Sequence, residues 1–359
     1  MRPEGVESAL LSARWYSDDD ILALEMEKLF LKGPRYVGHE LSVPRVGDRR
    51  PVDLDGEGLI LARGASGVEV LVNACRHRQA VVVTEPGNSK HIQCPFHKWT
   101  YGMDGTLIGT PHFSPRPCRN LFSVPTTAWN GLVLAGPAAV ERDLHGWADG
   151  GLFRFDGHAF HSSVEMECRQ NWKTFVEVYL DLYHVAPFHP GLAGLVSCDE
   201  LRWTAGEFYS VQTVGMRKDI SGGATPAYER WQSKIREAFP VLPERGAVWA
   251  FYYPNLMLEW NPGSIMVSVL SPRSPSVTAN RIEFFYDEEV VGRVPGFVEA
   301  HQAAYFETAA EDEVLGQMMD RGRRNLKAGG REDAGPIQSP MEDGIVLFHR
   351  YVLDRIREP

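Results

Sequence analysis

The sequence predicts an α+β protein of two domains, a small all-β domain followed by a larger domain in which strands are grouped between helices. Three observations lead to this prediction. The length of 359 residues exceeds that of an average single domain. Residues 36–136 form short strand-like runs separated by turns rich in Gly and Pro. Helical patterns at 171–186 and 297–323 then enclose a further group of strand-like runs.

The composition is that of a globular protein, with 43% hydrophobic and 23% charged residues. A net charge of −10 argues against nonspecific binding to nucleic acid or to an anionic membrane. Because the N-terminal stretch has no apolar signal core and no apolar run is long enough to span a membrane, we expect a cytoplasmic protein. In that compartment five cysteines favour metal binding or free thiols over a disulfide framework.

The chain begins with a predicted helical segment, residues 1–35, that packs on the larger domain. Ser17 and Asp20 have the spacing of a capping box, and Gly33-Pro34 ends the helix. Within the small domain, which we place at 36–145, two pairs of strands flank Gly-containing turns at 64–67 and 102–105. Each pair predicts a β-hairpin.

The larger domain is placed at 146–359. Its strand-like runs are 208–215, 247–253, 256–260, 263–271 and 280–286. The polar, Gly-rich stretch 325–337 predicts a mobile loop. Ser339-Pro340-Met341-Glu342 has the pattern of a capping box with proline at the first helical position, and it predicts a final helix to about Arg355.

A group of potential metal ligands lies in the helical stretch 171–189. Asp181 and His184 are three residues apart, so on a helix they share a face. His189 is too far along for the same face, but Pro187 breaks or kinks the helix and can turn His189 back toward His184. Two such imidazoles and a carboxylate from elsewhere would form a two-His-one-carboxylate iron site. An ordinary amphipathic helix with two histidines is the alternative.

A second group of potential ligands lies in the small domain. Cys75 and His77 form C-x-H, and Cys94 and His97 form C-x-x-H. Sixteen residues, 78–93, separate the two motifs. Zinc binds such a set tetrahedrally, whereas a Rieske [2Fe–2S] cluster takes two Cys on one iron and two His on the other. Because each loop supplies one Cys and one His, the pattern favours the Rieske cluster.

These motifs resemble those of one family. CRHR at 75–78 and CPFHKWTYGMDGTLIG at 94–109 resemble the cluster loops of Rieske non-haem iron oxygenases of the ring-hydroxylating type. NWK with the following D-x-Y-H-x4-H in 171–189 resembles the iron motif of the same family. The resemblance implies a Rieske domain followed by a helix-grip (START-like) catalytic domain with mononuclear Fe(II). YPNLMLEW at 253–260 and FHR at 348–350 resemble the choline- and betaine-type monooxygenase branch.

The resemblance assigns roles to individual residues. It implies that the cluster ligands are Cys75, His77, Cys94 and His97, and that His184 and His189 bind the iron. The third iron ligand is expected in Glu311-Asp312-Glu313, where the family's usual Glu-Asp pair points to Asp312 and leaves either Glu as an alternative. Asp181 matches the acidic residue that links the two metal centres across a subunit boundary, which implies a homotrimer.

Two residues beside the cluster motifs depart from the family pattern. Gln79 and Lys98 both stand where glycine is usual. Neither is a ligand. We expect the charge of Lys98, next to His97, to favour the reduced cluster and to raise its potential modestly.

The sequence also predicts the partners of such an enzyme. It has no G-x-G-x-x-G in a strand–helix unit and no plant-type C-x4-C-x2-C, so electrons must come from an external reductase or ferredoxin. We expect a terminal oxygenase that uses O2 to hydroxylate or oxidatively demethylate a small organic substrate. A cis-dihydroxylating aromatic-ring dioxygenase, a Rieske electron carrier without oxygenase activity and a structural zinc protein are the alternatives.

The substrate pocket is expected between the sheet and the iron-binding helices. Its candidate wall residues are Phe175, Val178, Phe251, Tyr253, Leu256, Leu258, Trp260 and Met266. Tyr253 and Trp260 would suit a cation–π cage for a quaternary ammonium group, and the same aromatic set would suit an aromatic ring. For most residues in 251–260, a place in the alternating core of the sheet is the competing interpretation.

Overall fold

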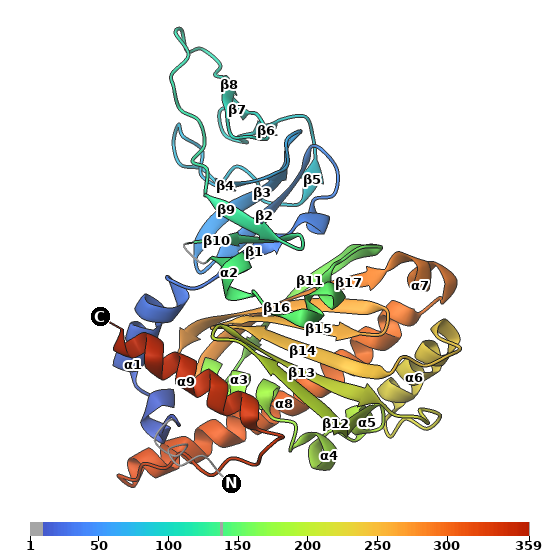
Figure 1. Cartoon of the computed structure of the whole chain (residues 1–359). Coiled ribbons are helices and arrows are strands. Elements are labelled where there is room, and N and C mark those ends of the chain that lie inside the picture. Colours follow the sequence, from blue (N-terminus) through green and yellow to red (C-terminus); the bar gives the residue numbers. More distant parts are fainter. Residues whose placement is uncertain (1–9, 137–138, 359) are drawn as a thin grey trace. The chain divides into compact units, whose positions relative to one another are not determined.

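The computed structural model describes residues 10–136 and 139–358, and it divides them into two compact units. The small unit spans 34–141; the large unit combines the described residues up to Gly33 with those from Arg142 onward. Both helices and sheets are present in the large unit, and the small unit is mainly β (Figure 1). The predicted α+β architecture of two domains is therefore confirmed. None of the helices in the described residues is long and apolar enough to cross a membrane.

The small unit contains three antiparallel sheets within its described residues, with strand orders β1-β10-β9, β4-β3-β2-β5 and β6-β7-β8. Their bounds are β1 Arg35–His39, β2 Asp48–Leu54, β3 Glu57–Arg63, β4 Val68–Val72, β5 Gly87–Asn88, β6 Ile92–Gln93, β7 Thr100–Tyr101, β8 Leu107–Gly109, β9 Thr126–Trp129 and β10 Leu132–Ala135. Both predicted hairpins form, as β3–β4 and β7–β8. A short helix, α2 (Val140–Asp143), follows β10.

The apolar run in β3 lies between two cores. Ile60 and Ala62 pack with Cys75 and Cys94 on one side, and Leu59 and Leu61 pack on the other. Because side chains alternate along a strand, a run that is apolar at every position serves a strand buried on both faces. This strand thereby anchors the two potential cluster loops to the rest of the small unit.

The large unit is built on one antiparallel sheet, in which the described residues form seven strands in the order β11-β17-β16-β15-β14-β13-β12. Their bounds are β11 His158–Cys168, β12 Val196–Ala205, β13 Tyr209–Met216, β14 Arg245–Tyr252, β15 Leu256–Asn261, β16 Ser264–Ser274 and β17 Val277–Asp287. Helices of this unit are α1 Asp19–Glu25, α3 Trp172–Leu180, α4 Val185–Phe188, α5 Pro190–Ala193, α6 Pro226–Ala238, α7 Glu288–Arg293, α8 Phe297–Ala328 and α9 Asp343–Arg357.

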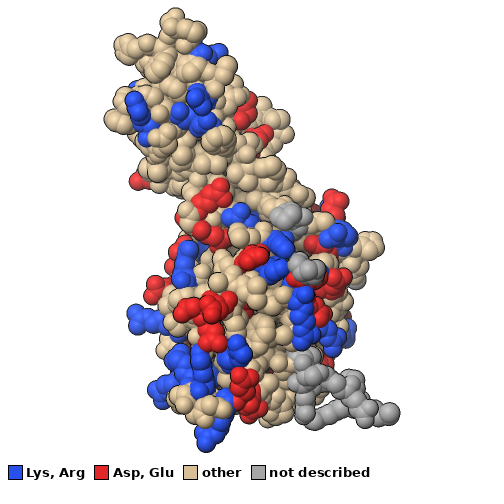
Figure 2. Space-filling model, turned by 90° about the vertical axis from the view of Figure 1, so that its left-hand side faces the viewer, with Lys and Arg blue, Asp and Glu red and all other residues tan. Residues whose placement is uncertain are grey.

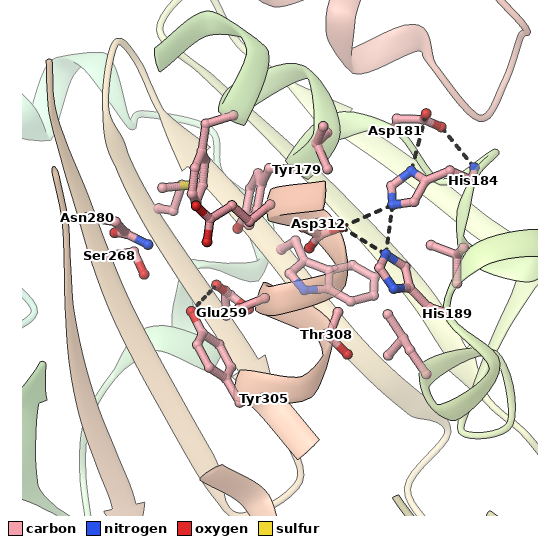
Figure 3. A pocket seen from close by; sticks show the side chains of 18 of the residues that line it. Tyr179, Asp181, His184, His189, Glu259, Ser268, Asn280, Tyr305, Thr308 and Asp312 are labelled. Carbon is pink, nitrogen blue, oxygen red and sulfur yellow. Dashed lines mark hydrogen bonds and ion pairs between the residues drawn. The ribbon is translucent and has the colours of Figure 1, made fainter. Parts of the chain in front are cut away.

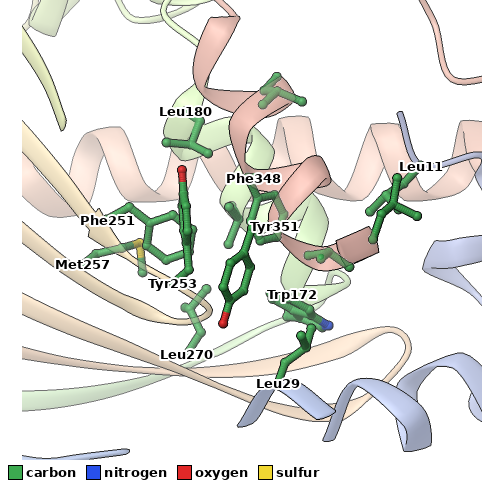
Figure 4. Packing of buried hydrophobic residues seen from close by; sticks show 14 of the residues in the cluster. Leu11, Leu29, Trp172, Leu180, Phe251, Tyr253, Met257, Leu270, Phe348 and Tyr351 are labelled. Atoms are coloured by element: carbon green, nitrogen blue, oxygen red, sulfur yellow. The ribbon is translucent and has the colours of Figure 1, made fainter. Parts of the chain in front are cut away.

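One face of this sheet packs against helices, and the main core lies between them (Figures 1 and 4). Trp172 and Leu180 of α3 and Phe348 of α9 meet Phe251 and Leu270 of the sheet there. The rings of Phe251 and Phe348 are 5.8 Å apart between centroids. Each buried aromatic side chain of this kind contributes on the order of 2–3 kcal/mol to the free energy of unfolding. This packing fixes α3, which leads directly into the predicted iron motif.

A buried ionic network also ties α3 to distant parts of the chain. Glu177 of α3 accepts hydrogen bonds from Tyr16 and Arg323, and His349 Nε2 of α9 lies 2.8 Å from its Oε1. Glu177 is 3% exposed. Burial raises its pKa, but the charge of Arg323 and the bonds from His349 and Tyr16 outweigh burial and lower the pKa to about 2. The carboxylate is therefore ionised and joins the N-terminal segment, α3, α8 and α9.

Several local predictions differ from the structure. The first helix is capped at Asp18 instead of Ser17, without a side-chain hydrogen bond, and it continues as a π-helical turn over Met26–Phe30. The last helix begins at Asp343 and not at Pro340, because Ser339 bonds the Asp343 side chain instead of capping a helix. Helix α8 extends to Ala328 into the stretch predicted as loop. Strand β12 and helix α6 had no counterpart among the sequence predictions.

Candidate metal centres and substrate cavity

The helix that was expected to carry Asp181 and His184 on one face ends before either residue. Asp181 is extended, with φ −93° and ψ 118°, and its Oδ1 accepts hydrogen bonds from the backbone N–H groups of Tyr183 and His184 at 2.5 and 3.3 Å. An aspartate that binds the backbone two and three residues ahead offers an alternative to continued helix, so α3 stops at Leu180. The two side chains nevertheless meet, with Asp181 Oδ2 3.2 Å from His184 Nδ1.

Short helices then return His189 to His184. Pro187 lies inside α4, where the first-turn N–H groups need no helical partner, and Pro190 is the first residue of α5. Nε2 of His184 and Nε2 of His189 lie 3.0 Å apart. The proline break therefore brings the two imidazoles together as predicted, although through two separate helical turns.

A carboxylate from α8 completes this group. Asp312 Oδ1 lies 2.8 Å from His189 Nε2 and 3.4 Å from His184 Nε2. Donors about 2.1 Å from one metal ion at right angles to each other would lie about 3 Å apart, so the three atoms fit one face of an octahedral ion. Within the described residues, this is the one set of three His, Cys, Asp or Glu side chains that converges in this way. The donor set and its geometry fit the mononuclear iron expected from the sequence.

Two further carboxylates hold the outer nitrogens of the imidazoles. Asp181 contacts Nδ1 of His184 (Figure 3), and Glu311 Oε2 lies 2.7 Å from Nδ1 of His189. Each contact keeps a proton on Nδ1 and directs the Nε2 lone pair inward. Glu313, the other alternative for the third ligand, accepts hydrogen bonds from Arg169 N and Gln317 instead. Glu311 thus contacts the ring nitrogen of His189 that does not face Asp312. The sequence did not predict this contact.

The electrostatics of this group favour a cation. Burial lowers the pKa of His184, but the hydrogen bonds to Asp181 and Asp312 outweigh burial and raise it to about 9. Burial raises the pKa of Asp312, and its bonds with His184 and His189 reverse that effect to give a lowered value. The surrounding carboxylates therefore stabilise positive charge between the Nε2 atoms, whether a proton or a metal ion carries it.

The two loops of the small unit also bring their Cys and His residues together. The rings of His77 and His97 are 4.6 Å apart between centroids, and Cys75 and Cys94 are both buried in the same apolar cluster. The Tyr101 hydroxyl lies 3.4 Å from Cys75 Sγ. Nδ1 of His77 is buried and has no hydrogen-bond partner in the described part of the chain, as a nitrogen reserved for a metal would be. These residues fit a cluster with two Cys and two His ligands.

The two departures from the family pattern have a shared backbone conformation. Gln79 has φ 56° and Lys98 has φ 59°, both in the left-handed region that favours glycine. Each follows a potential ligand pair and closes its loop, with Gln79 N bonded to Cys75 O and Lys98 N to Cys94 O. The usual glycines thus have a conformational explanation, and this chain forms the same turns with non-glycine residues.

The stretch of chain that contains the cluster loops is basic. Residues 34–141 contain eleven Lys and Arg against nine Asp and Glu, whereas the whole chain has a net charge of −10. Six of these cations lie between residues 76 and 119, together with two acidic residues: Arg76, Arg78, Lys90, Lys98, Arg116 and Arg119. Figure 2 shows separate groups of Lys and Arg on the visible face of the small unit. The stretch that contains the cluster loops therefore carries a net positive charge.

A cavity adjoins the His184–His189–Asp312 group, between the sheet and helices α3, α6 and α8 (Figure 3). Phe175 and Val178, two of the predicted wall residues, line it. Its other lining residues include Tyr179, Trp249, Met257, Glu259, Asn261, Ser268, Asn280, Tyr305 and Thr308. The sheet and α8 thus supply most of the polar wall, and α3 supplies apolar side chains.

Other candidates for the wall lie elsewhere. Phe251 and Tyr253 pack beneath α9 in the main core. Leu258 and Trp260 pair with Ala250 and Val248, on the opposite face of the sheet from Phe251.

Leu256 shares that opposite face, since it pairs with Tyr252, and Met266 packs in a separate cluster with Phe284. Tyr253 and Trp260 therefore form no cage. Alternation places Met257, Glu259 and Asn261 toward the cavity, one residue out of step with the prediction. The signal that would have identified Glu259 is a lone charge inside an apolar strand.

Comparisons with known proteins agree with both sites. Residues 34–127 match the Rieske [2Fe-2S] domain, and 155–358 match the ring hydroxylating alpha subunit (catalytic domain). Putrescine 2-hydroxylase of Ralstonia nicotianae is 46% identical over 337 residues, covering 94% of this chain and 92% of the relative. Putrescine 2-hydroxylase of Bordetella bronchiseptica is 39% identical, covering 94% and 82%.

A solved quaternary ammonium Rieske monooxygenase, described with insights into carnitine oxidation and inter-subunit electron transfer, superposes with a TM-score of 0.78. It covers 97% of this chain and 95% of its own at 18% identity, which shows a shared fold. The catalytic-domain match rules out a bare electron carrier, and the Rieske match rules out a structural zinc protein.

The protein is therefore an oxidoreductase with a Rieske [2Fe–2S] cluster and mononuclear iron, and it acts on a small substrate as the terminal oxygenase of a system whose electron donor is a separate protein. The chain belongs to the ring-hydroxylating alpha subunit family of Rieske non-haem iron oxygenases.

Proposed function

We propose that this oxygenase hydroxylates a short aliphatic amine with primary amino groups, and that putrescine is the first candidate. The observation that carries the proposal is the charge of the cavity beside the His184–His189–Asp312 group. Its lining includes the further carboxylates Asp181, Glu259 and Glu313, and no Lys or Arg is among the described residues that line it. Such a cavity favours a cationic substrate. The two relatives named as putrescine 2-hydroxylases support the same chemistry.

The metal ligands follow from the geometry above. In this proposal Cys75, His77, Cys94 and His97 hold the Rieske cluster, and His184, His189 and Asp312 hold the iron. When bound, the iron and the cluster supply O2 activation and the one-electron transfers that this activation requires. Monohydroxylation balances when two electrons and two protons enter with O2, so that one oxygen atom joins the C–H carbon and the other leaves as water.

The chain itself orients and shields the reaction. Asp181 and Glu311 fix the two imidazole rings through Nδ1, so that both Nε2 atoms face the cavity. Phe175 and Val178 cover one side of the cavity with apolar surface and limit the access of water. The carboxylate of Asp181 remains 21% exposed, which leaves it accessible to a neighbouring subunit.

We further propose a homotrimer in which the cluster of one subunit delivers electrons to the iron of the next, with Asp181 as the link. Asp181 is suited to this role because one of its oxygens already contacts the imidazole of His184, while its exposed edge can bond a second imidazole. The net positive charge of the stretch around the cluster loops suits an approach to this acidic region.

The substrate proposal is tested with purified enzyme, a surrogate Rieske reductase system and NADH. Oxygen consumption and products are measured with 1,4-diaminobutane, 1-aminobutane, choline, carnitine and an aromatic hydrocarbon. We expect 1,4-diaminobutane, which is putrescine, to give coupled turnover and a product heavier by one oxygen atom. Coupled turnover of choline or carnitine, with no product from any primary amine, would contradict the proposal.

A further inference from the structure

Three polar side chains meet on the sheet wall of the cavity. Glu259, Ser268 and Asn280 lie on the neighbouring strands β15, β16 and β17. Met257 pairs with Ser268, and Leu270 pairs with Asn280, so all three polar residues project from the same face of the sheet. Figure 3 shows them across the cavity from His184 and His189, with Asp312 between the two groups. The cavity thus has an iron-binding side and a polar side.

The polar side is a buried set of acceptors for which the described chain supplies few donors. Glu259 is 9% exposed, Ser268 1% and Asn280 4%. Asn280 Oδ1 has no hydrogen-bond partner in the described parts of the chain. Ser268 Oγ makes no hydrogen bond of normal geometry there and interacts with the Tyr305 hydroxyl, and Glu259 Oε1 accepts a bond of 3.3 Å from Tyr305. Buried acceptors without partners cost stability unless a ligand supplies donors. This arrangement therefore indicates a ligand group rich in N–H.

The charges around Glu259 agree with this reading. Burial and the charge of Asp312 raise the pKa of Glu259, hydrogen bonds from Tyr305 and Trp249 lower it, and the net result is a pKa of about 7. Tyr179 and Tyr305 are the other titratable groups that interact with this carboxylate. Since none of these neighbours is a cation, a positively charged ligand would be its first opposite charge. Trp249 and Tyr305 add aromatic surface suited to a cation.

We propose that Glu259, Asn280 and Ser268 bind the ammonium group of a diamine substrate that lies farther from the carbon hydroxylated at the iron. This inference rests on the proposed function and deepens it. A primary ammonium carries three N–H donors, one for each of the three side chains. A quaternary ammonium carries none, and it would leave the acceptors unsatisfied. The polar side of the cavity thus favours primary ammonium groups over quaternary ones.

Substituting Glu259 tests the anchor. For Glu259→Gln we expect kcat/KM for 1,4-diaminobutane to fall by about 100-fold or more, because a buried charge pair is lost. Turnover of 1-aminobutane, whose single ammonium can occupy the same anchor, should fall as well. Calorimetric binding of 1,4-diaminobutane should weaken in parallel. The matched control is Glu283→Gln, because Glu283 is 2% exposed on β17 but lies out of step with Asn280.

A change of length provides a second test. Glu259→Asp moves the carboxylate back by one methylene, so the preferred substrate should shift from 1,4-diaminobutane toward 1,5-diaminopentane. The ratio of the two kcat/KM values is measured, and an unchanged ratio would contradict the anchor. The Rieske absorption and thermal unfolding midpoint of each variant establish that it is folded.

The two levels of the hypothesis fail in different ways. Wild-type enzyme that neither binds nor hydroxylates 1,4-diaminobutane would overturn the proposed function and the anchor together. Wild-type enzyme that hydroxylates this diamine, together with a Glu259→Gln variant of equal kcat/KM and affinity, would overturn the anchor alone.

Discussion

At the scale of single residues, two non-glycine residues beside the cluster motifs adopt the left-handed conformation that favours glycine. Lys98 adopts φ 59°, where a side chain costs about 1–2 kcal/mol relative to glycine in the folded state. Glycine in turn loses more conformational freedom on folding, which offsets part of that difference. The remaining strain is local and leaves the positions of Cys94 and His97 intact.

Replacing Lys98 with glycine should therefore change two measurements in opposite directions. We expect Lys98→Gly to raise stability by about 0.5–1 kcal/mol, seen as a higher midpoint for thermal loss of the Rieske absorption. We also expect a modestly lower reduction potential by voltammetry, because a positive charge beside His97 is removed. Lys90→Gly is the control, since exposed Lys90 does not have positive φ and glycine there should destabilise. An unchanged potential would refute the electrostatic role of Lys98.

Residue patterns in the sequence predicted which Cys, His and Asp side chains converge better than they predicted the wall of the cavity. Cys, His and Asp in characteristic spacings are few, and their chemistry restricts what they can bind. Glu259 was missed because an alternating strand gives two faces, and only the three-dimensional sheet shows which face meets the cavity. Leu258 and Trp260, which flank Glu259 in sequence, were therefore predicted to line the cavity, although they lie on the opposite face of the sheet.

At the scale of elements, strands were easier to predict than the ends of helices. The strand-like runs of the large unit correspond to β13–β17, whose alternation and turns are local signals. Helix α3 ends at Leu180 because the side chain of Asp181 competes for backbone N–H groups, a choice that periodicity does not reveal. Ser17 and Ser339 had capping patterns but made other contacts or none, since a cap depends on where the preceding chain is held.

The ionic network around Glu177 predicts how the helices depend on pH. Because its pKa in the folded protein is about 2, below the ordinary value of 4.5, the carboxylate stabilises the fold at pH values above that ordinary value. This contribution is lost as the pH falls toward 2. Glu177→Gln leaves the 18%-exposed Arg323 with only the more distant carboxylate of Asp320, at 3.8 Å, and should cost about 3 kcal/mol near neutral pH.

The pH dependence is measured as the difference in unfolding free energy between wild type and Glu177→Gln in denaturant. We expect the difference to shrink as the pH is lowered from about 5 to about 3. Other buried carboxylates, such as Glu25 and Asp320, are present in both proteins and largely cancel. Glu207→Gln, at a side chain 71% exposed beside Arg355, is the control and should change stability by less than about 1 kcal/mol. A difference that grows on acidification would contradict the assigned role.

At the scale of the whole molecule, the proposed trimer requires electrons to pass between chains. One chain with its cluster ligands removed (Cys75→Ser, Cys94→Ser) and a second with its iron ligand removed (His184→Ala) should each be inactive. When the two are co-expressed with different tags and purified as mixed oligomers, we expect activity to return, because an intact cluster of one chain can face the intact iron of another. Inactive mixed oligomers would indicate transfer within a chain.

The same arrangement predicts a specific defect for Asp181→Asn. We expect both metal centres to remain loaded and the cluster to be reduced at the normal rate, while its reoxidation by O2 in the presence of substrate slows by at least about 10-fold. Stopped-flow absorption of the Rieske cluster measures both steps. A variant with normal reoxidation and coupled turnover would show that Asp181 is not the link.

The large unit separates its two tasks between kinds of structure. The proposed iron donors come from helical segments, His184 and His189 around α4 and α5 and Asp312 on α8, whereas Glu259, Ser268 and Asn280 come from the sheet. Substitutions on the inner face of β15–β17 can therefore alter which molecule is held without altering how oxygen is activated. A small library confined to those three strand positions is thus a direct route to oxygenases that accept shorter, longer or uncharged substrates. For the same reason, divergence among natural relatives is expected to accumulate in the strands sooner than in the helices that hold the metal.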